Sequence, residues 1–116
     1  MPNYMLLLRG CPKSHDLSPE EMQKIIEKYS AWRQGLADAG RLVGSEKLTD
    51  GEGRVLRRKN GGVRVLDGPY SETKEVIGGY FAIRAADYDE AVEVARGCPH
   101  LDYDGTVELR EIEEAH

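Results

Sequence analysis

Apolar residues recur at helical spacing over residues 18–40. Ser18, Pro19 and Glu21 supply an N-cap, a proline at the first helical position and a capping box. Gly40 supplies a residue suited to the left-handed position that ends many helices. The pattern predicts one amphipathic helix that packs against a sheet through a shared apolar face. That face consists of Met22, Ile25, Ile26, Tyr29, Trp32 and Leu36.

Shorter apolar or alternating segments predict the remaining elements. They are strands at 3–10, 41–48, 78–85 and 106–112, a hairpin at 54–68 that turns at Asn60-Gly61, and a second helix at 87–99. Two crossover helices on one face of an antiparallel or mixed sheet give an α+β fold, the ferredoxin-like split βαβ arrangement with an extra hairpin.

The two helices can cover only one face of this sheet. The other face is expected to expose part of the apolar set, such as Leu6, Leu8, Phe81, Ile83, Leu109 or their alternates. An uncovered apolar sheet face is a typical association surface. We therefore expect a homodimer that buries it.

Composition narrows the class of protein. With 116 residues, the chain 1–116 is expected to form a single domain. The net charge of −5 argues against nucleic acid and against an anionic membrane surface as partners. The sequence shows no apolar segment long enough to span a membrane and no secretory signal. We expect a cytoplasmic protein, with Cys11 and Cys98 reduced and Cys98 a buried structural thiol.

Cofactor chemistry finds no support in the sequence. The three histidines, His15, His100 and His116, show no ligand spacing, so no metal is expected. Both predicted helices begin with acidic caps and lack a glycine-rich phosphate loop, so no nucleotide cofactor is expected either.

Residues 67–80, DGPYSETKEVIGGY, are unusually rich in hydrogen-bonding groups for a turn. They fit a ligand-binding loop anchored at both ends, or a solvated turn whose charges simply face water. The adjacent hairpin is basic, with Arg54, Arg57, Arg58, Lys59 and Arg64. Those charges fit an anion-binding edge, but we favour a role in deterring unwanted strand pairing.

The stretch DGPYSETKEVIGGYFAI, followed by ARGCPH and VELREI, resembles the YCII-related proteins, and most closely their DGPF branch. Tyr70 stands where that branch has Phe. The resemblance implies a dimeric α+β barrel like that of muconolactone isomerase, a pocket near the dimer interface, a bacterial source and association of some members with sigma factors. The family's proposed active site is a His–Asp pair, but the histidine position in the first turn of helix one holds Glu21 here.

His100 is the histidine that this sequence offers instead. It is either a surface histidine that closes a helix or a general acid/base, with Asp67 as the carboxylate that orients its ring. Tyr70, Glu72 and Lys74, together with His15, are the expected ligand-binding residues. These features favour a binding protein for a small polar ligand, with no assured catalysis. The alternative is a cofactor-free acid–base enzyme of isomerase, lyase or dehalogenase type that acts on a small oxidised organic acid or aromatic.

Overall fold

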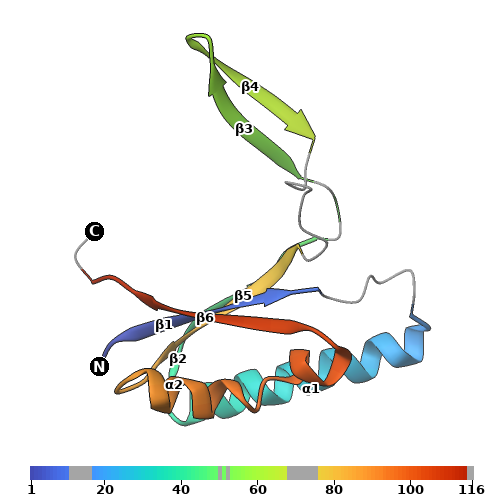
Figure 1. Ribbon diagram of the computed structural model, residues 1–116. Helices are drawn as coiled ribbons and strands as arrows, with labels where there is room; N and C mark the ends of the chain where they lie inside the picture. Colours follow the sequence, from blue (N-terminus) through green and yellow to red (C-terminus); the bar gives the residue numbers. More distant parts are fainter. Residues whose placement is uncertain (11–16, 50, 52, 68–75, 115–116) are drawn as a thin grey trace.

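The computed structural model describes residues 1–10, 17–49, 51, 53–67 and 76–114 (Figure 1). In chain order the elements are β1 (Asn3–Arg9), α1 (Pro19–Asp38), β2 (Leu42–Lys47), β3 (Arg54–Lys59), β4 (Gly62–Asp67), β5 (Ile77–Arg84), α2 (Tyr88–Ala95), the 3₁₀ helix η2 (Pro99–Tyr103) and β6 (Thr106–Ile112). The α+β, ferredoxin-like prediction is confirmed, and the short helix η2 is the element that the sequence pattern did not predict.

Four strands form one antiparallel sheet in the order β2-β5-β1-β6. Each crossover helix therefore joins two strands that are separated by one strand between them, which is the split βαβ arrangement. Both helices lie on the same face of the sheet (Figure 1). Strands β3 and β4 form a separate two-stranded sheet, the extra hairpin.

Local sequence sets both ends of α1 and the start of α2 as predicted, whereas α2 ends at Ala95, before the predicted end at residue 99. The Ser18 hydroxyl accepts a hydrogen bond from the Glu21 amide, and the Glu21 carboxylate accepts one from the Ser18 amide, which completes the capping box. At the other end of α1, Gly40 has a φ of 72°. The Asp87 carboxylate accepts a hydrogen bond from the Glu90 amide and begins α2.

The core lies between the helices and one face of the sheet. Alternation along β1 and β5 points Tyr4, Leu6, Leu8, Phe81 and Ile83 toward the helices, where each is at most 6% exposed. Residues of the helices and of the segment after α2 complete the core: Leu36, Ala91, Ala95 and Cys98. The ring of Trp32 meets that of Phe81 edge-on at 4.9 Å between centroids.

The opposite face of the sheet carries the alternates of these residues. Met5, Leu7, Tyr80 and Ala82 pair across β1 and β5 and lie on that face, with Ile112 of β6 nearby in register. The Arg9–Glu108 ion pair, 3.0 Å between Nη2 and Oε1, borders it. We call this surface the open sheet face.

Candidate functional site

His100 lies in a buried cluster between η2, α1 and β1. Its side chain is fully buried, so the interpretation as a surface histidine is wrong. The Nδ1 atom lies 2.9 Å from the hydroxyl oxygen of Tyr29, and Nε2 lies 2.5 Å from the carbonyl oxygen of Arg9. The sequence placed His100 just beyond a helix, but the helix η2 that turns it inward was not predicted.

These two contacts define the hydrogen-bond roles of the ring. A carbonyl oxygen only accepts, so Nε2 carries a proton and donates to Arg9. In the neutral ring Nδ1 then accepts from the Tyr29 hydroxyl; in the charged ring the direction of that bond reverses. The ring also packs directly against the backbone of Gly105, since a Cβ added there would lie 2.2 Å from Nε2.

Asp67 lies in a different part of the molecule. It ends β4 on the hairpin, where its side chain is 78% exposed and its carboxylate is 3.7 Å from Nη1 of Arg54. Within one chain, the contacts that the structure gives to the described residues do not join Asp67 to His100. The catalytic roles of both residues stay predictions.

The other predicted ligand-binding residues lie outside the part of the chain that the structure describes. They are His15, Tyr70, Glu72 and Lys74.

A pocket of about 300 Å³ opens between α1 and the β2–β5 edge of the sheet. We call it the α1–β5 pocket. Its apolar wall consists of Leu8, Ile25, Ile26, Tyr29 and Phe81, and its polar residues on the helix side are Ser30, Arg33, Ser45 and Lys47. Glu46 and Tyr80 also belong to the lining, but they alternate to the open sheet face. The backbone of Gly78 and Gly79 completes the lining.

Gly79 explains part of the Gly-Gly pair in the sequence. A Cβ at this position would lie 2.7 Å from the carbonyl oxygen of Glu46 on β2. Glycine at this position therefore allows the backbones of β2 and β5 to approach closely.

Two cations make the pocket suitable for an anion. Arg33 Nε donates to the Ser45 hydroxyl at 2.8 Å, which holds the guanidinium at the pocket wall. A guanidinium has five N–H donors, and two of them can bind a carboxylate side by side. Lys47 Nζ donates to the carbonyl of Leu48 at 2.9 Å.

Tyr29 links the pocket to the buried cluster. Its ring lines the pocket and lies parallel to Phe81, while its hydroxyl bonds to His100. His100 therefore stands behind the pocket wall, one hydrogen bond from a residue that a ligand would touch.

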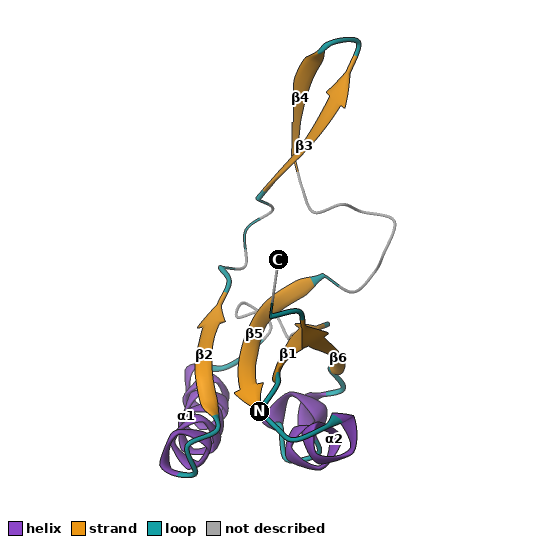
Figure 2. Ribbon diagram, turned by 90° about the vertical axis from the view of Figure 1, so that its left-hand side faces the viewer, coloured by secondary structure: helices purple, strands orange, loops and turns teal. Residues whose placement is uncertain are grey.

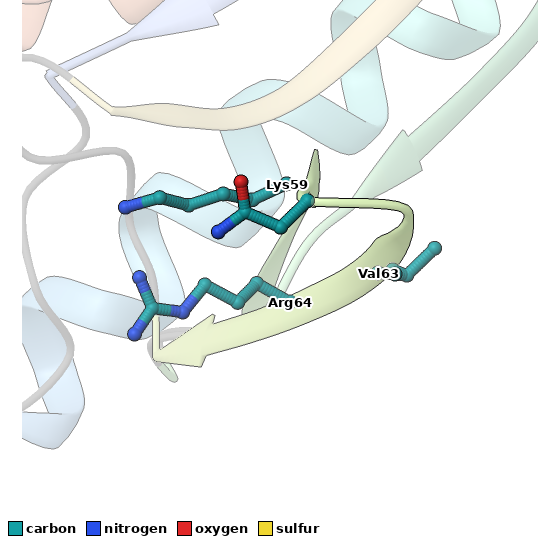
Figure 3. A pocket seen from close by; sticks show the side chains of 5 residues that line it. Lys59, Val63 and Arg64 are labelled. Carbon is teal, nitrogen blue, oxygen red and sulfur yellow. The ribbon is translucent and has the colours of Figure 1, made fainter.

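A second concavity, of about 340 Å³, lies at the tip of the hairpin between Lys59 and Arg64 (Figure 3). The side chains of these two residues extend to one side of the hairpin, and Val63 points to the other. Every residue that lines it is exposed, so it is a surface feature and not an enclosed site.

Over the described ranges, no group of three His, Cys, Asp or Glu side chains is arranged to hold a metal ion. None of the helices in those ranges is both long and apolar enough to cross a membrane.

Comparison with known families matches residues 3–116 to the YCII-related domain. The chain belongs to the YCII-related family. An uncharacterised protein of Rhizobium meliloti (strain 1021) is 35% identical over 80 residues, and the match covers 68% of this chain and 64% of that protein. The chain thus spans less than two thirds of the length of this relative.

Sequence reasoning missed the pocket cation Arg33 and the pocket tyrosine Tyr29. A signal for both exists in helix α1, because Ile26, Tyr29 and Arg33 follow one another at steps of three and four residues.

Proposed function

We propose that this YCII-related protein binds a small organic acid with an apolar body in the α1–β5 pocket of a homodimer, without need of a reaction. The observation that carries this proposal is the combination of an apolar wall with the Arg33 guanidinium in one pocket of ligand size. The apolar wall would take the body of the ligand and Arg33 its carboxylate.

The position of the pocket supports the dimer part of the proposal. Tyr80 and Glu46 belong to the pocket lining and pair with each other in register, and both alternate to the same side of the sheet as Leu7. The pocket and the open sheet face thus share the β2–β5 edge of the sheet. A second copy packed on that face would lie close to a ligand in the pocket.

We assign the chain to the DGPF branch on residues 67–80 and retain Tyr70, Glu72 and Lys74 as proposed ligand contacts, with His15 as a further one. The stretch that holds the first three precedes Gly78 and Gly79 in sequence, and both glycines line the pocket. Association with a sigma factor stays a prediction from the family resemblance.

Calorimetric titration with benzoate tests the binding function, with benzyl alcohol as a neutral ligand of similar size. We expect benzoate to bind more tightly than benzyl alcohol. The Arg33→Gln variant should weaken benzoate binding about 10- to 100-fold, since a hydrogen bond to a charged group contributes roughly 1.5–3 kcal/mol.

The matched control is Lys24→Gln, which removes the same charge from an exposed position of α1 outside the pocket lining. Equal weakening by the two variants would mean that benzoate responds to overall charge and not to the pocket. Equal affinity for benzoate and benzyl alcohol would contradict the assignment of an acid as ligand.

The hydrogen bond between Tyr29 and His100 favours a second candidate function, acid–base catalysis on the same class of ligand. Imidazole takes and gives protons near neutral pH, and the Tyr29 hydroxyl could pass a proton between His100 and a pocket ligand. Tyr29 and the Arg9 carbonyl already bond to the two ring nitrogens of the buried His100, so this candidate function does not need Asp67 to orient the ring.

Catalysis is tested with a panel of small lactones and halo acids, on the wild type and on His100→Gln. Turnover that His100→Gln abolishes while benzoate still binds would support the enzyme. Absence of turnover over the panel, with benzoate bound normally, would leave the binding function as the better description.

A further inference from the structure

The β3–β4 hairpin extends away from the helices, on the side of the open sheet face (Figures 1 and 2). Its two strands pair only with each other in the described sheets. The turn at Asn60-Gly61, with φ of 52° and 81°, is the predicted two-residue hairpin turn. An isolated two-stranded hairpin is marginally stable in water, so this one needs a surface to pack on.

The register gives the hairpin two faces, and one of them carries three exposed apolar side chains. Leu56 pairs with Val65, and Val63 lies two residues before Val65 on the same face, where it pairs with Arg58. These three side chains are 62%, 60% and 53% exposed, respectively. We call them the apolar face of the hairpin.

The other face carries three of the five basic side chains of the hairpin, Arg57, Lys59 and Arg64, beside the pair of Val55 and Leu66. Lys59 and Arg64 extend to the same side (Figure 3). These charges favour a partner surface of negative charge.

The remainder of the chain has that charge. Residues 54–67 hold five basic side chains and one acidic one, a net charge of +4. Because the whole chain has a net charge of −5, everything outside the hairpin amounts to −9. Outside its own hairpin, a second copy of the chain thus has a net charge opposite in sign to that of the hairpin.

We propose that the β3–β4 hairpin is an arm that packs on a second copy of this chain, with its apolar face buried against that copy. The proposal rests on the homodimer of the proposed function and adds a contact to it. A subunit seated on the open sheet face would lie on the side to which the arm extends. Nucleic acid would match the basic face but would leave the apolar face in water, so a protein partner fits both faces better.

Sedimentation equilibrium on the whole chain tests the arm. Leu56→Ser and Val65→Ser should each raise the dimer dissociation constant at least about tenfold, since each removes a large apolar group from the proposed contact. The matched control is Leu101→Ser on η2, which is 45% exposed and lies on the helix side of the sheet. It should leave the constant unchanged.

Photo-cross-linking tests the contact without relying on the serine variants, which could unfold the hairpin. p-Benzoylphenylalanine at position 56 should give cross-linked dimers, whereas the same residue at position 101 should not.

The outcomes distinguish failure of the arm proposal from failure of the dimer proposal on which it depends. If Leu7→Glu on the open sheet face dissociates the dimer while Leu56→Ser and Val65→Ser do not, the dimer stands and the arm is refuted. A wild-type chain that stays monomeric at high concentration would refute the dimer and the arm together. Binding of duplex DNA through the arm, with no effect on self-association, would also overturn the inference.

Discussion

Tyr29→Phe removes one oxygen atom from the hydrogen bond that connects α1 to η2. Phenylalanine keeps the ring that lies parallel to Phe81 and lines the pocket, so packing should change little. What is lost is the 2.9 Å bond to Nδ1 of His100, a side chain with no exposed surface. The substitution therefore removes that bond and keeps the ring.

The magnitude follows from the burial of His100. Removing one partner of a buried polar group costs about 1–3 kcal/mol, more than the net 0.5–1.5 kcal/mol of a bond exposed to water. We expect Tyr29→Phe to lower the free energy of unfolding by about 1–3 kcal/mol. In urea denaturation this shifts the midpoint by roughly 1 M, given a slope on the order of 1–3 kcal/mol/M.

Tyr80→Phe is the control for this measurement. It also removes one tyrosine hydroxyl, but the structure gives that hydroxyl no hydrogen bond within the described residues. It should change the free energy of unfolding by less than about 0.5 kcal/mol. Equal effects of the two variants would refute the reasoning that the buried His100 makes the Tyr29 bond important.

Three further substitutions test other parts of the structure. Gly105→Ala should destabilise the fold by about 2 kcal/mol or more in urea denaturation, since its Cβ would displace the His100 ring; a loss below 0.5 kcal/mol would contradict that packing. Hydrogen bonds from Arg41 and the Ala86 amide lower the pKa of Glu90, so its contribution is present at neutral pH and lost as pH falls below about 4.5; Glu90→Gln should flatten this part of the stability–pH profile, and an unchanged profile would argue against it. Gly35→Ala, at an exposed position of α1 with open space around it, should raise the melting temperature through a gain of about 0.5–1 kcal/mol, and a decrease would contradict the helix geometry.

Much of the fold could be predicted because its signals are local. The capping box at Ser18, the Asn60-Gly61 turn and the alternation in β1 each depend on a few neighbouring residues. The topology then follows from the right-handed crossover rule, which leaves few ways to arrange two helices and four strands.

The candidate site depends on contacts between residues far apart in the chain. His100 and Tyr29 are 71 positions apart, and His100 and Arg9 are 91 apart. Nothing near His100 in sequence indicates that η2 turns its ring toward β1. Asp67 seemed a natural partner because both residues carry suitable chemistry, but the hairpin holds it at an exposed strand end.

The uncovered sheet face could be predicted in part: its existence follows from the sequence, but the residues that form it do not. The sequence indicated that one face would stay open and that either of two alternating sets could form it. Only the packing of the helices decides between them, and Met5, Leu7, Tyr80 and Ala82 are the set left outside.

The most direct test of the central claim is a ¹H–¹⁵N spectrum of the protein titrated with benzoate. A small acid in the α1–β5 pocket should shift the backbone signals of residues 25–33, 45–47 and 78–81 in a saturable way, and should leave the hairpin tip at 59–64 unchanged. Shifts confined to the basic hairpin tip, or the absence of any saturable shift, would contradict the pocket as the ligand site.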